Sequence, residues 1–117
     1  MIKSVYSIAV MVRDGKRAAK WYREKFGFKQ VDRMEHWITV APKGSKMLIH
    51  LCEVQKEWGT KLEPGNSGLA MVTDNLDKTY KELTAKGVVF KQKPMDRGWG
   101  KYAIVKDPDN NEFTLYE

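Results

Sequence analysis

The sequence repeats itself weakly, and this internal repeat restricts the possible fold more than any other feature. Ser7 aligns with Gly68 at a spacing of 61 residues, because Ser-Ile-Ala-Val in the first half corresponds to Gly-Leu-Ala-Met in the second. By the end of each half the spacing is 64, and Glu53 aligns with Glu117. Self-similarity of this kind indicates two copies of one supersecondary unit. We therefore predict two similar modules in one chain.

Each half has the pattern of one strand, one helix and three further strands. In the first half, apolar residues at helical spacing follow Asp14, which suits a helix N-cap, and Gly27 stands where a left-handed residue ends a helix. In the second half, Asn75 and Gly87 hold the corresponding places. Period-two and β-rich segments predict strands, and a polar segment with Gly and Pro predicts a linker. The strands are expected at 5–12, 28–34, 36–42, 46–54, 68–73, 88–94, 100–107 and 112–117, and the linker at 57–68.

These elements predict an α+β fold. A chain of 117 residues is the size of a single domain, 1–117, with one βαβββ module at about 1–56 and the other at about 67–117. Each sheet is expected to curl into an open half-barrel with one helix on its outer face. One helix cannot cover both faces of a sheet, so the inner face must be filled by side chains, a ligand or a partner chain.

Composition limits the partners. The net charge is +6, which favours anionic ligands, but Lys and Arg are scattered in runs of at most two and no nucleic-acid-binding motif occurs. We predict no nucleic-acid partner and, because the apolar runs are short, no membrane span. The one cysteine, Cys52, cannot form an internal disulfide, and a cytoplasmic location is expected. Cys52 lies in an apolar run, typical of a buried hydrophobe; a nucleophilic role needs a nearby base.

Two stretches connect the chain with a known family. Residues 7–28, SIAVMVRDGKRAAKWYREKFGF, and residues 97–117, RGWGKYAIVKDPDNNEFTLYE, resemble the opening and closing motifs of the vicinal oxygen chelate family, which includes glyoxalase I, extradiol dioxygenases, fosfomycin-resistance transferases and bleomycin-resistance proteins. The resemblance implies a glyoxalase-like fold. It also implies that Asp107 and Pro108 form a structural turn, with Asn110 in a position that tolerates a left-handed conformation.

Metal-dependent members of that family hold a divalent ion with His, Glu or Gln from four strand positions. The resemblance places these positions at Ser7, His50, Gly68 and Thr114. Only His50 offers a strong ligand, whereas a stable site for zinc, nickel, manganese or iron needs three or more imidazole or carboxylate groups. We therefore predict no metal and no other cofactor.

Other side chains suit a small organic ligand. Trp58, Trp99 and Tyr102 lie in or beside Gly-containing loops, where aromatic rings either stack on a ligand or close the ends of a barrel. Arg97 offers a two-pronged donor for an anion, or it is simply solvated. His50 is either an anion-binding or basic group or a hydrogen-bonded core histidine, and His36 is expected to be half exposed. The predicted ligand-binding residues are Ser7, His50, Trp58, Arg97, Trp99, Tyr102, Thr114 and Tyr116.

The sequence supports more than one function. The first is a metal-free small-molecule-binding protein of the glyoxalase/bleomycin-resistance type that binds a neutral or anionic, partly aromatic ligand in a barrel cleft, as a homodimer. The alternative is a glyoxalase-like lyase or isomerase with a degenerate or unusual metal site around His50. A nucleic-acid or regulatory module is suggested by charge alone.

Overall fold

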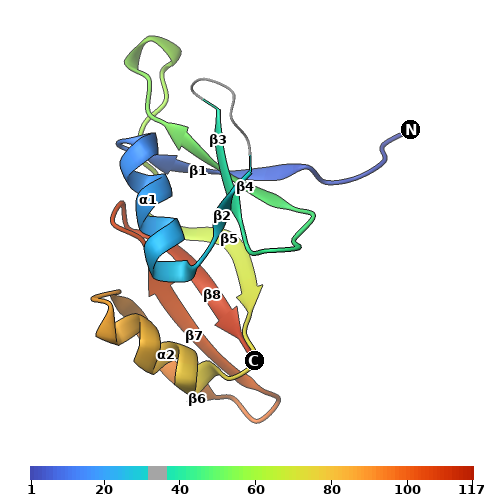
Figure 1. Cartoon of the computed structure of the whole chain (residues 1–117), viewed down its shortest axis with the longest axis vertical. Helices are drawn as coiled ribbons and strands as arrows, with labels where there is room; N and C mark the ends of the chain where they lie inside the picture. Colours follow the sequence, from blue (N-terminus) through green and yellow to red (C-terminus); the bar gives the residue numbers. More distant parts are fainter. Residues whose placement is uncertain (32–36) are drawn as a thin grey trace. The chain divides into compact units, whose positions relative to one another are not determined.

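The chain divides into two compact units. The computed structural model describes residues 1–31 and 37–117 (Figure 1). The first unit comprises Met1–Leu62 and the second Glu63–Glu117. His36, for which the sequence predicts half exposure, lies outside the described residues. No helix in the described ranges is long and apolar enough to cross a membrane.

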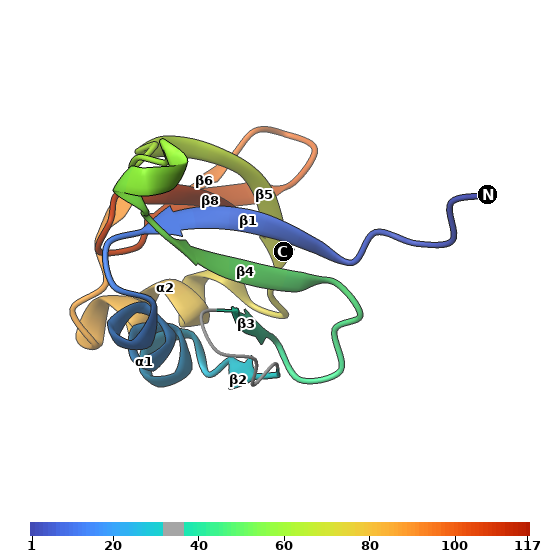
Figure 2. The same cartoon turned by 90° about the horizontal axis from the view of Figure 1, so that it is seen from above.

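The first unit is a four-stranded mixed sheet with one α-helix on one face. Its strands lie in the order β1-β4-β3-β2, and β1 is parallel to β4 while the other pairs are antiparallel. The N-terminal segment extends away from this sheet (Figures 1 and 2). The elements are β1 (Ser7–Val12), α1 (Gly15–Phe26), β2 (Lys29–Gln30), β3 (Ile38–Ala41), β4 (Leu48–Glu53) and the 3₁₀ helix η1 (Lys56–Trp58).

The second unit has the same topology. Its strands lie in the order β5-β8-β7-β6, and β5 is parallel to β8. Ala9 pairs with His50 in the first unit and Ala70 pairs with Thr114 in the second, so the two alignment spacings seen in the sequence hold in the strand register. The predicted α+β fold of two βαβββ modules is confirmed. The elements are β5 (Gly65–Val72), α2 (Leu76–Ala85), β6 (Phe90–Asp96), β7 (Lys101–Lys106) and β8 (Asn111–Tyr116).

Helix α1 begins and ends where local chemistry sets its limits. The Asp14 carboxylate accepts a hydrogen bond from the backbone N–H of Arg17 at 3.1 Å, and Gly27 closes the helix in the left-handed conformation at φ 72°. Ala18, Ala19 and Tyr22 are buried. Because two of these buried residues are small, α1 can lie close to the sheet. The helix covers only one face of that sheet.

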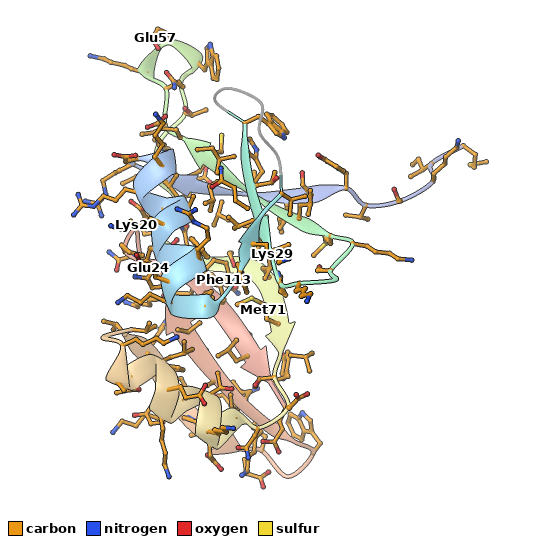
Figure 3. The ribbon with its side chains drawn as sticks, viewed as in Figure 1. Lys20, Glu24, Lys29, Glu57, Met71 and Phe113 are labelled. Atoms are coloured by element: carbon orange, nitrogen blue, oxygen red, sulfur yellow. The ribbon has the colours of Figure 1, made fainter. Side chains whose placement is uncertain are left out.

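Helix α2 is built in the same way. The Asn75 side chain accepts a hydrogen bond from the backbone N–H of Lys78 at 3.0 Å. Leu76 and Leu83 are buried, and Phe113 of β8, labelled in Figure 3, is among the largest fully buried side chains. The core of the second unit therefore lies between α2 and one face of its sheet.

A carboxylate at the end of the last strand binds the start of the helix in both units. Glu53 Oε1 accepts a hydrogen bond from the backbone N–H of Gly15 at 3.4 Å, and Glu117 Oε1 accepts one from Leu76 at 2.8 Å. These backbone N–H groups have no partner within their own helix. The contact ties the start of each helix to the end of the sheet of its own unit. The two residues that make it are far apart in the sequence.

The structure corrects several predicted strand boundaries, including 5–12 to Ser7–Val12 and 88–94 to Phe90–Asp96, and the start of β5 is the most informative case. Residues 65–67 were expected in the linker, but β5 begins at Gly65, which pairs with Asn111 and donates a backbone hydrogen bond to the carbonyl of Asn110 at 2.8 Å. A bulge follows between Asn66 and Ala70. The polar residues of this segment are not typical of a strand, so the sequence did not predict one here. They form hydrogen bonds within the bulge, where the Ser67 hydroxyl donates to the carbonyl of Glu112 at 2.6 Å.

The Asp-Pro-Asp-Asn-Asn segment is a turn organised by one buried carboxylate. Asp107 Oδ1 accepts hydrogen bonds from the backbone N–H groups of Asp109 and Asn111 at 2.9 and 2.8 Å, and Oδ2 accepts one from the side-chain amide of Asn111 at 2.9 Å. Asn110 has a φ of 64°. The turn thus connects β7 to β8 through its own hydrogen bonds, as the sequence predicts.

Removal of this carboxylate is expected to destabilise the protein. Asp107→Ala leaves buried donors without an acceptor, at a cost of about 2–4 kcal/mol in the free energy of unfolding. Asn110→Gly, in the same turn, keeps the left-handed conformation and should change stability by less than about 0.5 kcal/mol. Urea unfolding followed by circular dichroism measures both. Equal stability of Asp107→Ala and wild-type protein would show that the turn does not depend on the carboxylate.

Candidate functional site

The face of the first sheet that α1 leaves open carries the candidate site of the first unit. His50 lies at the centre of β4, with Ala9 of β1 and Thr39 of β3 as its register partners. Register partners on neighbouring strands project to the same face, and side chains two residues apart on one strand also share a face. His50 is therefore on the face opposite to Val10, Val12 and Leu51, which are buried on the helix side.

An aromatic contact covers the imidazole. The rings of Trp37 and His50 are stacked, with centroids 3.8 Å apart and an angle of 22° between their planes. His50 is 8% exposed, whereas Trp37 is 38% exposed. The pair forms a flat platform, with the histidine protected and the tryptophan accessible.

The stacked imidazole is held neutral by its surroundings. Burial lowers the pKa of His50, because desolvation disfavours the charged form. In the described part of the chain, every fully buried nitrogen or oxygen of a side chain has a hydrogen-bond partner. His50 is thus a largely buried group whose charged form is disfavoured.

The other predicted positions of the first unit differ in their relation to His50. Ser7 is at the start of β1 and pairs with Leu48, one step along the same face from the Ala9–His50 pair. Cys52 is a free thiol on β4, half-buried, and pairs with Met11 on that face. The strand register thus gathers Ser7, His50 and Cys52 on a single face.

The third predicted ligand-binding residue of this unit lies elsewhere. Trp58 is the last residue of η1, in a loop that extends away from the sheet; Figure 3 labels its neighbour Glu57. Its side chain is 74% exposed and has no ring contact among the residues described. Trp58 is therefore not brought next to His50 within the unit.

The open face of the second sheet carries a row of large side chains. Tyr116 of β8 has Val72 of β5 and Tyr102 of β7 as register partners, and Tyr102 in turn has Met95 of β6. Thr114 lies one step along the same face. Val72, Met95 and Tyr116 are exposed. Tyr102, Thr114 and Tyr116, which are among the predicted ligand-binding residues, therefore lie on one face of this sheet.

The guanidinium group of Arg97 lies against this row of side chains. The guanidinium carbon of Arg97 lies 3.9 Å from the centroid of the Tyr102 ring, and the Tyr102 hydroxyl donates to Met95 Sδ at 3.7 Å. No acceptor for the guanidinium N–H groups is found in residues 1–31 and 37–117. Trp99, in the same β6–β7 turn, is 82% exposed. Arg97 is thus oriented by an aromatic ring while its donors stay available.

The four family ligand positions do not supply the donors that a divalent metal needs. Ser7 and Thr114 are hydroxyls, and only His50 provides an imidazole. Gly68 lies in the β5 bulge at a φ of +77°, a conformation that favours glycine. In the part of the chain that is described, no three side chains of His, Cys, Asp or Glu gather into a possible metal site.

The sequence analysis did not predict that Trp37 and Met11 lie beside His50 and Cys52 on the open face of the first sheet. Trp37 was noted as an aromatic residue at a strand start, but its contact with His50 depends on the pairing of Ile38 with Leu51 and Thr39 with His50. Met11 is beside Cys52 because β1 and β4 are parallel. A register inferred from the turn at 42–47 would have been the only available signal for Trp37.

Comparison with known proteins identifies the family. The model of the Glyoxalase/Bleomycin resistance protein/Dioxygenase superfamily matches residues 5–115. The chain belongs to this superfamily. A member of the superfamily from Sphaerobacter thermophilus is 31% identical and superposes with a TM-score of 0.88, covering 99% of this chain and 98% of that one. The glyoxalase-like fold expected from the sequence is confirmed.

Two further proteins that are similar to this chain are informative. TnmS3, an antibiotic binding protein from Streptomyces sp. CB03234, is 30% identical with a TM-score of 0.81, over 98% of this chain and 95% of that one. YetH of Bacillus subtilis (strain 168) is 29% identical over 122 residues, which cover 100% of both chains. Solved structures similar to this superfamily member thus include a protein that binds an antibiotic.

The lowered pKa of His50 predicts a component of acid sensitivity. Between the lowered pKa in the folded state and the usual histidine value near ~6.5, the unfolded chain binds a proton that the folded chain does not. Stability is therefore fully present above the unfolded pKa and falls as the pH drops through this window. His50→Gln, which cannot titrate, should lose less stability than wild-type protein between pH ~7.5 and ~5.5 in urea unfolding. Identical losses would contradict the assignment.

Proposed function

We propose that this superfamily member is a small-molecule-binding protein that works without a bound metal ion. Its ligand is neutral or anionic and partly aromatic, and it is held on the open sheet faces by stacking and hydrogen bonding. The single observation that carries the proposal is the stacked Trp37–His50 pair, because it presents an aromatic surface and a neutral imidazole where metal-dependent relatives would need several ligands.

The first open face suits a planar neutral group. The accessible side of Trp37 offers a large π surface, and such rings gain about 0.5–1.5 kcal/mol from an aromatic partner beyond the area they bury. His50 adds either a donor or an acceptor, since a neutral imidazole carries one of each. A flat ligand with one polar edge therefore fits both groups, with Ser7 available further along the face.

The second open face suits an anionic aromatic group. Arg97 is fixed against Tyr102 and can give two parallel hydrogen bonds to a carboxylate, sulfonate or phosphate. Tyr116 and Thr114 extend the surface next to it. The net charge of +6 favours the approach of an anion over that of a cation.

Similarity to TnmS3 supports binding rather than catalysis as the starting hypothesis, since that protein is described as antibiotic-binding. We include Trp58 and Trp99 as further aromatic ligand contacts, because both are largely exposed and lie at positions that a ligand could cover. We also propose a homodimer, because each four-stranded sheet has two edge strands within its unit and exposed edges are normally covered.

Metal analysis separates this proposal from the enzyme alternative. Protein purified without chelator is expected to contain no stoichiometric zinc, nickel, manganese or iron, because His50 is the one strong donor at the four family positions. Elemental analysis by mass spectrometry measures the content. One equivalent of a transition metal, lost together with His50 in His50→Gln, would instead support a glyoxalase-like lyase or isomerase.

Ligand binding can be tested with paired probes that differ in charge. Naphthoate and naphthamide share one aromatic ring system, and isothermal titration calorimetry measures the affinity of each. Arg97→Met should weaken naphthoate about 10-fold or more and leave naphthamide almost unchanged, because only the carboxylate uses the guanidinium. Trp37→Leu should weaken naphthamide about 2- to 10-fold, the equivalent of one lost aromatic contact.

A tryptophan that faces the helix side provides the matched control. Trp21 of α1 packs edge-on against Tyr22 and Phe26, so Trp21→Phe removes indole without altering either open face. This variant should bind both probes as wild-type protein does. If Trp37→Leu and Trp21→Phe bind naphthamide equally, the Trp37–His50 platform is not a ligand site.

A further inference from the structure

The open face of the second sheet carries a second group of charged side chains, at the end of the strands away from Arg97. Lys106 of β7 pairs in register with Glu112 of β8. The Tyr102–Tyr116 pair lies four residues away along the same two strands. Because alternate residues of a strand share a face, Lys106 and Glu112 lie on the same open face as the two tyrosines.

Two ammonium groups and one carboxylate occupy this end of the face. Lys91 Nζ lies 3.2 Å from Glu112 Oε1, and the Glu112 side chain is only 12% exposed. Lys106 is half-buried and forms no ion pair within residues 1–31 and 37–117. Since Lys91 already neutralises the carboxylate, this end keeps an excess of one positive charge, which Lys106 carries.

The guanidinium at the other end has no competing carboxylate either. Arg97 lies over the Tyr102 ring, with its central carbon 3.9 Å from the ring centroid. Asp96, its neighbour in the sequence, accepts a hydrogen bond from the backbone N–H of Gly98 at 2.8 Å. Among the residues that the structure describes, Asp96 forms no ion pair with Arg97. Each end of the face therefore offers one cation to an anion.

Uncharged side chains separate the two cations. Ile104 of β7 pairs in register with Thr114, and Ala70 of β5 pairs with Thr114 from the other side. These residues lie between Tyr102 and Lys106 on the open face. Their aliphatic surface, next to an aromatic ring, suits the apolar body of a flat ligand.

The spacing of the two cations sets the length of that ligand. Tyr102 and Lys106 are four residues apart on β7, and four steps along a strand span roughly 13 Å. The ammonium of Lys106 ends a flexible four-carbon stem, whereas the guanidinium of Arg97 is held against a ring. The two groups can thus reach the opposite ends of a ligand built from two linked aromatic rings, but one small anion cannot bridge them.

We propose that the second open face is a two-point anion site for an elongated, planar aromatic ligand with an anionic group at each end. Arg97 binds one anionic group and Lys106 binds the other, while the rings lie over Tyr116 and Ile104. This inference rests on the proposed function, since it gives the ligand of this face a second anionic group and a defined length.

Two biphenyl probes test the proposal in isothermal titration calorimetry. The para-linked dicarboxylate has one carboxylate at each end of its two rings, and the monocarboxylate lacks one of them. Wild-type protein should bind the dicarboxylate about 10-fold or more tighter, because Lys106 adds a charge-assisted hydrogen bond. Lys106→Gln should reduce this preference to about 2-fold, the statistical advantage of a ligand with two equivalent ends. Equal affinities of wild-type protein for the two probes would overturn the proposal.

A lysine on the helix side provides the matched control. Lys81 is exposed on α2, which covers the opposite face of the sheet, so Lys81→Gln makes the same change in net charge without altering the open face. This variant should keep the wild-type preference for the dicarboxylate. A preference that survives in Lys106→Gln, or one that falls equally in Lys81→Gln, would show that Lys106 is not the second anion-binding group.

Arg97→Met separates this inference from the proposed function. It removes the cation that both probes use, so it should weaken both. If wild-type protein binds the two probes equally and Arg97→Met weakens both, the second anion point fails while the proposed anionic ligand stands. If wild-type protein binds neither probe, the second open face fails as a ligand site altogether.

Discussion

The hydrogen bond between the last-strand carboxylate and the first turn of the helix sets the geometry of both units. Glu53 and Glu117 hold equivalent places, and each accepts a backbone N–H at the helix start. An anionic group there also interacts favourably with the positive end of the helix dipole. With the helix fixed to one face, the opposite face of each sheet is left without a helix of its own, and every candidate functional residue on a strand is found there.

Those two open faces have diverged although their frameworks match. His50 and Thr114 are equivalent by register, as are Ala9 and Ala70. In the first unit the central position carries a buried imidazole under an indole, whereas in the second it carries a hydroxyl beside a Tyr–Arg stack. One backbone plan therefore presents a neutral aromatic platform on one face and a cationic aromatic row on the other.

The sequence predicted the architecture well because the relevant signals are local or repeated. Asp14, Gly27 and Asn75 mark the helix limits through bonds that span only a few residues, and Asp107 organises its turn in the same way. The start of β5 was missed because strand pairing, which is non-local, overrides the polar composition of Asn66 and Ser67. Local chemistry is readable from sequence, and pairing between distant segments is much less so.

The candidate site was predicted only in part for the same reason. Thr114 and Tyr116 could be grouped from strand alternation alone, but placing Tyr102 beside them requires the register between β7 and β8, and the stacking of Trp37 on His50 requires the register between β3 and β4. The contact of Arg97 with Tyr102 depends on the course of the β6–β7 turn. Residues brought together by alternation along one strand were found, and those brought together by strand register or by turn geometry were not.

The bulge at Gly68 restricts which residues this superfamily member can carry at that position. A Cβ at this position would meet no atom within 4 Å, so there is space for a larger residue, but the φ of +77° makes such a substitution strained. Left-handed backbone costs an ordinary L-residue roughly 1–2 kcal/mol, and a histidine there would also start from a strand that bends away from regular pairing. The choice of residue at position 68 is therefore tied to the bulge itself: a larger side chain has room there, but it would weaken the strand that carries it.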